Sequence, residues 1–258
     1  PDTENPVHPE QIEGHVIFQN VRFGYDPEKI VIQDFCAEAL PGQKIAIVGP
    51  TGAGKTTLVK LLMRFYDVNS GSILLDGYNI KDFARGDLRC MFGMVLQDTW
   101  LYNDTIMENI RYGLPGASDE DVIEAAKAAH VDHFVRTLPD GYNLVLNEES
   151  TNISQGQKQL LTIARAILLD PTMLILDEAT SSVDTRTEVL IQKAMDNLMQ
   201  NRTSFIIAHR LSTIRNADWI LVINEGNIVE QGKHNNLLDS HGFYADLYYS
   251  QFDHTKIS

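Results

Sequence analysis

A glycine-rich segment that ends in a lysine and two hydroxyl residues carries the clearest chemistry in this sequence. It matches the spacing G-x-x-x-x-G-K-[ST] at every fixed position. Glycines let backbone N–H groups turn inward toward an anion, and the amino end of a following helix adds its dipole. Lys55 can reach the β- and γ-phosphates of a nucleotide, and the Thr56 hydroxyl suits Mg²⁺. This phosphate loop, residues 49–57, predicts a triphosphate site made by Gly49, Thr51, Gly52, Ala53, Gly54, Lys55, Thr56 and Thr57.

Two adjacent carboxylates follow the apolar run 174–176. Parallel strands present their carboxyl ends to ligands, so Asp177 is placed to hold Mg²⁺ through water. Glu178, one residue further, is suited to orient or deprotonate an attacking water. A solvated Asp-Glu pair at the start of a loop is the structural alternative, which the phosphate loop upstream makes the weaker one. The pair favours hydrolysis over transfer to another acceptor, for which the sequence offers no recognisable site.

Two more polar residues come directly after apolar strands. His209 follows 205–208 and would lie at the same sheet edge as Asp177, within reach of a γ-phosphate. A histidine there could equally be structural, and the residues alone leave both readings open. Gln97 follows 93–96, and by itself such a glutamine carries little information.

The elements that position these residues alternate between strands and helices. Apolar strands that alternate with amphipathic helices predict an α/β fold, namely a P-loop NTPase core with a parallel sheet. An N-terminal antiparallel β portion precedes it, and a helical subdomain is inserted at about 84–165. Residues 1–13 read as a linker and 14–258 as one domain. The expected strands are 16–23, 32–39, 44–48, 72–75, 77–80, 173–176, 203–208, 219–223 and 228–230, and the expected helices are 55–65, 118–138, 154–169 and 185–199.

Composition limits the partners. The net charge is −14 over 258 residues, so the surface repels nucleic acid and anionic lipid, although a local positive pocket can still hold one small anion. Two cysteines, Cys36 and Cys90, allow at most one disulfide, and a reducing cytosolic setting is expected. The most apolar stretch, 160–176, is interrupted by Arg165 and Asp170, so another segment or subunit would have to cross a membrane.

The stretch from Asn152 to Gln157, Asn-Ile-Ser-Gln-Gly-Gln, resembles the signature motif of ATP-binding cassette (ABC) ATPases, whose usual form is Leu-Ser-Gly-Gly-Gln. The resemblance covers about residues 14–250. The amino-acid sequence of these motifs is similar to that of the nucleotide-binding domain of a bacterial exporter of the multidrug type. The family's motifs occur in the family's order: Tyr25, the phosphate loop, Gln97, the signature 152–157, Asp177-Glu178, 181–184 and His209.

The resemblance implies roles for residues around one ATP. Tyr25 would stack on adenine, although an aromatic beside Gly24 could also belong to the core. Gln97 would contact Mg²⁺ and the attacking water and relay to the membrane domains. His209 would contact the γ-phosphate. The implied cofactors are ATP and Mg²⁺.

The resemblance also implies a head-to-tail dimer around two ATP molecules. Ser154, Gly156 and Gln157 would bind the γ-phosphate of ATP held by the opposite subunit, and Asp184 would cross the dimer interface. The implied partners are a second nucleotide-binding domain and the transmembrane domain of the same transporter, which places the chain at the cytoplasmic side of the cell membrane. No nucleic-acid partner is expected.

Two departures from the family pattern bear on these expectations. The signature has Ile153 for leucine and Gln155 for the first glycine, while Ser154, Gly156 and Gln157 are kept. Residues 146–150 replace a more usual segment that contains glycine and arginine, and they resemble one subunit of heterodimeric exporters. Both a homodimer and a heterodimer therefore remain open.

Three other functions compete with the exporter. A non-transport ABC ATPase of DNA maintenance or translation would usually carry coiled-coil insertions or tandem cassettes. An importer ATPase is disfavoured by the exporter-like sequences of the motifs and by the lack of an extra C-terminal regulatory domain. A catalytically silent cassette is disfavoured by Glu178 and His209. A metal site at His130 and His133, three apart on an expected helix, lacks a third ligand.

Overall fold

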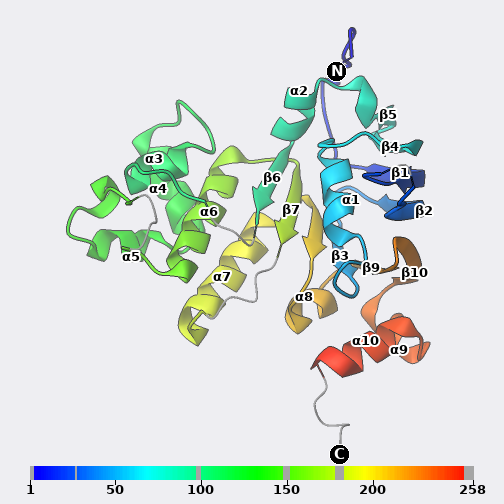
Figure 1. Ribbon diagram of the computed structural model, residues 1–258. Coiled ribbons are helices and arrows are strands. Elements are labelled where there is room, and N and C mark those ends of the chain that lie inside the picture. Colours follow the sequence, from blue (N-terminus) through cyan, green and yellow to red (C-terminus); the bar gives the residue numbers. More distant parts are fainter. Residues whose placement is uncertain (1–2, 27, 97–99, 148–151, 178–182, 253–258) are drawn as a thin grey trace, which may run out of the picture. The chain divides into compact units, whose positions relative to one another are not determined.

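The computed structural model describes residues 3–26, 28–96, 100–147, 152–177 and 183–252, of which 251 and 252 as backbone only. The chain forms two compact units. The first comprises residues 1–92, 175–178 and 201–258, and the second comprises 93–174 and 179–200. Figure 1 shows most of the strands in the first unit and helices α3 to α7 in the second. Each unit is described by itself below.

An antiparallel sheet opens the first unit. Its strands are β1 (Val16–Phe23), β2 (Ile32–Ala39), β4 (Ser70–Leu75) and β5 (Tyr78–Asn79), in the order β2-β1-β4-β5. Apolar side chains alternate with polar ones along β2, and the apolar ones are buried. The predicted antiparallel β portion is thereby confirmed.

A second sheet is centred on β3 (Lys44–Val48), which pairs in parallel with β8 (Thr203–Ile207) and with β9 (Trp219–Asn224). Its order is β10-β9-β3-β8-β7-β6, completed by β7 (Met173–Asp177), β6 (Phe92–Val95) and an antiparallel edge strand, β10 (Asn227–Gly232). All five residues of β8 are buried, as expected where helices and a second sheet cover both faces. The predicted parallel core is confirmed.

Aromatic packing joins the two sheets of the first unit. The Phe18 ring centroid lies 5.3 Å from that of Phe35 and 6.3 Å from that of Phe205, both edge to face. Strand β1 is thereby fixed against β8. The helices of this unit are α1 (Lys55–Leu62), α2 (Arg85–Cys90), α8 (Leu211–Arg215), α9 (His234–Asp239) and α10 (Phe243–Phe252), with a 3₁₀ turn at Ile80–Asp82.

In the second unit, α6 (Gln155–Leu169) packs against three other helices, α3 (Ile106–Arg111), α4 (Asp119–Ala128) and α7 (Thr185–Leu198). A capping box begins α4, because the Ser118 hydroxyl accepts from the Asp121 N–H while the Asp121 carboxylate accepts from the Ser118 N–H. A 3₁₀ turn at Gly141–Asn143 completes the unit.

The single helix predicted for residues 118–138 is wrong. The chain leaves the helix after Ala128, and His130 takes a left-handed conformation with φ of +57° before α5 (Asp132–Thr137) begins. The Val131 N–H donates to the Ala126 carbonyl, which closes the end of α4. His130 and His133 consequently do not share a helix. Within the described residues no group of three or more His, Cys, Asp or Glu side chains could hold a metal.

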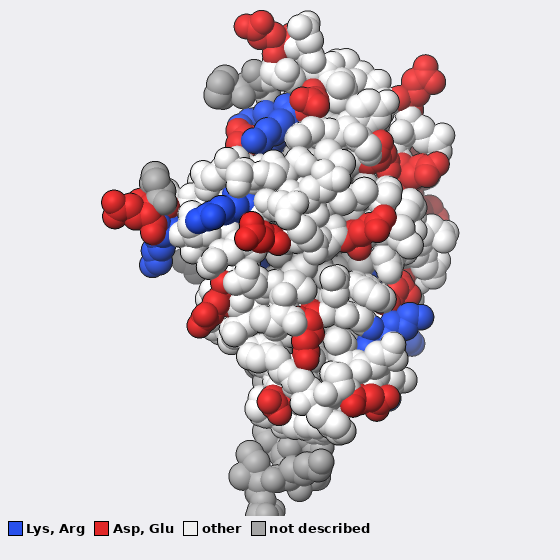
Figure 2. Space-filling view, turned by 90° about the vertical axis from the view of Figure 1, so that its right-hand side faces the viewer, with Lys and Arg blue, Asp and Glu red and all other residues white. Residues whose placement is uncertain are grey.

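The surface carries the expected acidic excess. Figure 2 shows Asp and Glu side chains spread over one whole face, with Lys and Arg in small separate groups. Where the structure is described, none of the helices combines the length and the apolar character that crossing a membrane requires.

A half-buried histidine ties the last two helices together. His234 Nδ1 lies 2.7 Å from the Tyr244 hydroxyl, which joins α9 to α10. Burial lowers the pKa of His234 below its usual value, and the nearby Arg215 lowers it further. The folded protein therefore favours neutral His234. A group whose pKa is lower in the folded state contributes stability above its unfolded pKa and loses that contribution as the pH falls.

The free energy of unfolding is accordingly expected to fall as the pH drops from about 6.5, the ordinary histidine value, towards the lower folded-state pKa of His234. Replacing His234 with asparagine should make this loss smaller. Urea unfolding at pH 7.5 and at pH 5.5 measures the difference. His133→Gln, at an exposed position on α5, is the matched control and should keep the wild-type loss. An equal acid loss in His234→Asn and in the wild type would contradict the prediction.

Candidate functional site

The phosphate loop begins where β3 ends, and two of its glycines are required by geometry. Gly49 has φ of +153°, and a Cβ atom there would lie 2.1 Å from the Ile223 carbonyl oxygen of β9. Gly54 caps α1 with φ of +108°. Neither position accommodates a side chain without strain. The loop is thereby held close to the sheet, with the amino end of α1 directly behind it.

The Lys55 side chain curls back over the loop. Its ammonium donates to the Gly49 carbonyl at 2.7 Å and to the Pro50 carbonyl at 2.9 Å. Burial lowers the pKa of Lys55, while the negative charge of Asp177 acts in the opposite direction. The loop therefore holds a cation beside a carboxylate at the carboxyl end of the sheet, where a triphosphate and a divalent cation could be bound.

His209 lies beside the phosphate loop because β8 runs parallel to β3. Ile47 pairs with Ile207, and the Ala208 N–H donates to the Ile47 carbonyl at 3.2 Å. A cavity of about 90 Å³, here called the loop cavity, lies next to this pair of strands. It is lined by Val48, Gly49, Thr51, Lys55, Ala208, His209, Ile214, Tyr244, Leu247 and Tyr248. The structure thus brings His209 together with three phosphate-loop residues.

Tyr25 stands at the edge of the same unit with half of its surface exposed. Its hydroxyl lies 3.2 Å from Thr57 Oγ1, and its ring meets Phe23 and Tyr66 edge to face, each at 5.0 Å. The Lys60 ammonium lies 5.8 Å from the ring centroid. These contacts fix the ring so that it could serve as a platform for a planar base. The sequence analysis did not identify Tyr66, because Tyr66 is distant from Tyr25 in the sequence and folding alone brings the two rings together.

The signature residues shape the amino end of α6 in the second unit. The Ser154 hydroxyl accepts from the Gln157 N–H at 3.3 Å, and the Gln157 side chain accepts from the Ser154 N–H at 2.8 Å. A Cβ on Gly156 would lie 2.5 Å from Thr187 Cγ2, so glycine lets α6 approach α7 closely. Asp184 caps α7 by accepting from the Thr187 N–H, and hydrogen bonds from the side chain and then from the backbone of Thr187 lower the pKa of Asp184.

Some predicted site residues lie outside the described residues, among them Gln97 and Glu178, and so do Ser181 and Ser182 of the motif at 181–184. Thr56, exposed at the start of α1, and Asp177 at the end of β7 belong to the first unit, as the phosphate loop does. Their oxygen donors are of the kind that Mg²⁺ prefers. Ser154, Gly156, Gln157 and Asp184 belong to the second unit.

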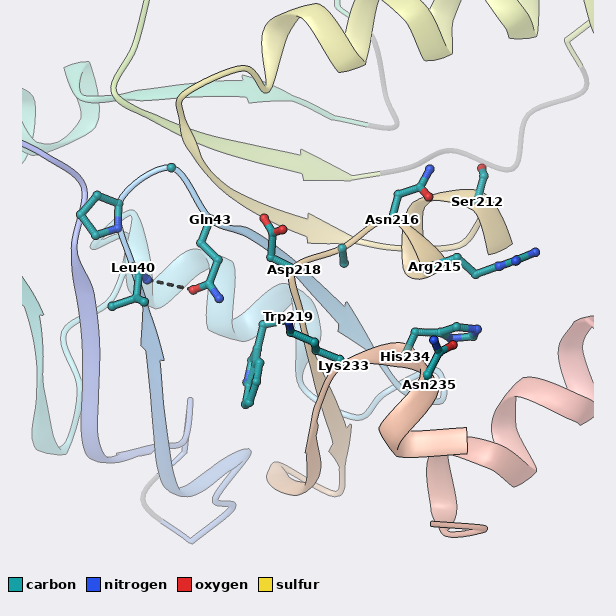
Figure 3. A pocket seen from close by; sticks show the side chains of 13 residues that line it. Leu40, Gln43, Ser212, Arg215, Asn216, Asp218, Trp219, Lys233, His234 and Asn235 are labelled. Atoms are coloured by element: carbon teal, nitrogen blue, oxygen red, sulfur yellow. Dashed lines mark hydrogen bonds between the residues drawn. The ribbon is translucent and has the colours of Figure 1, made fainter. Parts of the chain in front are cut away.

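A larger groove of about 930 Å³ lies elsewhere in the first unit (Figure 3). It opens between the turn 40–43, helix α8 and the start of α9, and Arg215 and Lys233 line it. Gln43 and Trp219 place it at the amino ends of β3 and β9, whereas the phosphate loop follows the carboxyl end of β3. The groove is therefore separate from the candidate nucleotide site.

Comparisons with known proteins relate the chain to one family. Residues 32–181 match the family described as ABC transporter. The chain is 59% identical over 247 residues to the "Fatty acid ABC transporter ATP-binding/permease protein" of Mycobacterium tuberculosis (strain CDC 1551 / Oshkosh), covering 96% of this chain and 38% of that protein. It is 49% identical over 241 residues to the "ATP-dependent lipid A-core flippase" of Coxiella burnetii (strain RSA 493 / Nine Mile phase I), covering 93% and 41%.

A solved structure is similar over nearly the whole chain. The chain matches "Structure of a bacterial Atm1-family ABC exporter with ATP bound" with a TM-score of 0.91 and 42% identity, covering 99% of this chain and 45% of that one. The chain thus spans less than half the length of the relatives it matches.

Proposed function

We propose, since this chain belongs to the ABC transporter family, that it is the ATP-binding and ATP-hydrolysing domain of an exporter. Residues 14–258 would form the ATPase domain, with the helical insertion at about 84–165. The observation that carries the proposal is the loop cavity, where Lys55, Thr51 and His209 meet at the carboxyl ends of neighbouring strands. The relatives named as exporter, flippase and ATP-binding/permease protein favour an exporter over an importer or a non-transport ATPase.

The reaction proposed is attack of water on the γ-phosphate. Backbone N–H groups of the phosphate loop and the Lys55 ammonium would bind the triphosphate, and Tyr25 would stack on adenine. Thr56, Asp177 and Gln97 would hold Mg²⁺, which neutralises charge on the phosphates when bound. Glu178 would orient the water and accept its proton, while His209 would donate a hydrogen bond to the γ-phosphate.

The second unit would act on the ATP of a partner domain. Ser154, Gly156 and Gln157 stand at the amino end of a 15-residue helix, a place suited to a phosphate because backbone N–H groups and the helix dipole point outward. Asp184 would cross the dimer interface. Dimer closure around two Mg·ATP would move the transmembrane domain of the same transporter, with this chain at the cytoplasmic side of the membrane. The relatives' fusion of ATP-binding and permease parts supports that partner.

Replacing Ser154 with arginine tests the dimer. Mg·ATP is expected to convert the wild-type chain from monomer to dimer, and Ser154→Arg should abolish this because the larger side chain fills the space of the partner's γ-phosphate. ATP affinity should stay within about twofold, since the variant's own phosphate loop is intact. Light scattering measures association and calorimetry measures affinity.

Ser118→Arg is the matched control, because Ser118 caps α4 through a capping box as Ser154 caps α6. It should dimerise like the wild type. For a natural heterodimer, the same comparison is made with the partner domain added. Loss of ATP binding in Ser154→Arg, or dimerisation unchanged from wild type, would contradict a role on the partner's nucleotide.

A further inference from the structure

The last helix of the described chain forms one wall of the loop cavity. Tyr244, Leu247 and Tyr248 of α10 lie at spacings of three and four, on one face of the helix, and line the cavity together with Thr51, Lys55 and His209. None of the roles assigned above uses α10. The phosphate loop and the C-terminal helix nevertheless line the same cavity.

Helix α10 is fixed at its start. Tyr244 is 1% exposed, its hydroxyl lies 2.7 Å from His234 Nδ1, and its N–H donates to Glu230 Oε2 at 2.6 Å. The Tyr248 ring continues this packing, with its centroid 5.3 Å from that of His234 and 6.2 Å from that of Tyr244. Tyr248 is therefore held by aromatic neighbours as it faces the cavity.

Two residues with proposed roles toward ATP, Lys55 and His209, line the loop cavity together with α10. Lys55 is held by the carbonyls of Gly49 and Pro50, which belong to its own loop. His209 stands in the short connection between β8 and α8, and its side chain is exposed. A change in α10 should therefore leave the Lys55 ammonium in place, whereas His209 lines the cavity together with Tyr248 and is exposed to the change.

We propose that Tyr248 is a positioning residue for His209, because its ring closes the space beside the imidazole and restricts the orientations that the imidazole can take. This inference rests on the proposed function, since it needs His209 to contact the γ-phosphate. The cavity of about 90 Å³ has room for no more than about three waters at ~30 Å³ each. Truncating Tyr248 would enlarge it, and small errors in the placement of a reacting group reduce rates steeply.

Tyr248→Ala is the first test. In steady-state hydrolysis of Mg·ATP by the chain, kcat is expected to fall about tenfold, while the Kd for ATP stays within about twofold. Tyr248→Phe keeps the ring and should retain most of the wild-type kcat. Phe243→Ala is the matched control, because Phe243 is an exposed aromatic residue of α10 and is not among the cavity residues. It should hydrolyse ATP like the wild type.

A double-mutant cycle separates positioning from general destabilisation. If Tyr248 acts through His209, then Tyr248→Ala combined with His209→Ala should be no slower than His209→Ala alone. An equal loss from Tyr248→Ala with and without His209 would overturn the proposal, and so would a wild-type kcat in Tyr248→Ala. Equal losses of kcat in Tyr248→Ala and Phe243→Ala would also overturn it.

The side-chain NMR signal of His209, identified by its absence in His209→Ala, gives a readout that does not require hydrolysis. It is expected to shift in Tyr248→Ala and to stay in place in Phe243→Ala, and the opposite pattern would overturn the proposal. Failure of the wild-type chain to bind or hydrolyse ATP would instead contradict the proposed function. The NMR comparison still decides whether Tyr248 positions His209.

Discussion

Replacing Lys55 with methionine is expected to weaken Mg·ATP binding about 100-fold. Lys55 is the basic residue of the phosphate loop, and its ammonium already lies against the loop carbonyls of Gly49 and Pro50. A hydrogen bond to a charged group contributes about 1.5–3 kcal/mol, and every 1.4 kcal/mol is tenfold in affinity. Methionine keeps most of the aliphatic stem, so the loss reports the charge rather than the packing.

Calorimetry measures this affinity, and a thermal unfolding curve checks that the variant is folded. Lys44→Ala is the matched control, because Lys44 opens the same strand, β3, at the end away from the loop. It should bind ATP like the wild type. Tyr25→Ala should cost about 1–3 kcal/mol, as loss of base stacking does elsewhere. Equal affinity in the wild type and in Lys55→Met would show that residues 49–57 do not bind the triphosphate.

Much of the fold could be predicted because short-range patterns decide it. The predicted bounds of β1, β2 and β3 coincide with the observed ones. Strands β1 and β2 show alternating apolar residues, and β3 is an apolar run. These patterns stop near turn residues such as Gly42 and Gly49. The same holds for the cap Ser118, whose side chain meets Asp121 three positions away. Such features need no knowledge of distant parts of the chain.

The errors arise where conformation depends on more than pattern. Apolar residues at helical spacing continue through Val131 and Val135, so the sequence gives no sign that His130 adopts a left-handed conformation between α4 and α5. Helices α9 and α10 were not predicted either. The apolar face of α10 is made of tyrosines, whose hydroxyls need partners that only the fold supplies, such as His234 for Tyr244.

The residues of the candidate site also fall into those that the sequence could predict and those that it could not. Residues at strand ends, such as Asp177 and His209, could be predicted because strand order brings those ends to one edge of the sheet. The contacts of Tyr66 with Tyr25 and of Tyr248 with the loop cavity could not, because they join segments that are far apart in the sequence. Their roles stay predictions until the variants are measured.

Replacing Glu178 with glutamine is expected to reduce ATP turnover by about 10²–10⁴, the usual cost of losing a general base. Glu178 follows the magnesium-side Asp177 directly in the sequence and lies outside the described residues. Glutamine keeps the size of the side chain and removes its charge. ATP should therefore still bind, and the closed dimer should persist longer because hydrolysis no longer opens it.

The matched comparison is His209→Ala, which should also slow hydrolysis but by losing a γ-phosphate contact. Because that contact helps to hold the closed state, the dimer should be trapped less firmly than in Glu178→Gln. Glu120→Gln, an exposed change in the first turn of α4, should leave both quantities unchanged. Turnover and dimer lifetime are measured together on each variant, in a transport-competent complex.

Wild-type turnover in Glu178→Gln would mean that another group activates the water. The proposed mechanism would then be wrong, even if Lys55→Met had lost ATP binding as expected. A chain that binds ATP without needing Glu178 would act as a nucleotide-binding regulator, and hydrolysis would belong to its partner domain. Residues 146–150 resemble one subunit of heterodimeric exporters, so a heterodimer remains open. This measurement therefore also decides which half of such a pair performs the chemistry.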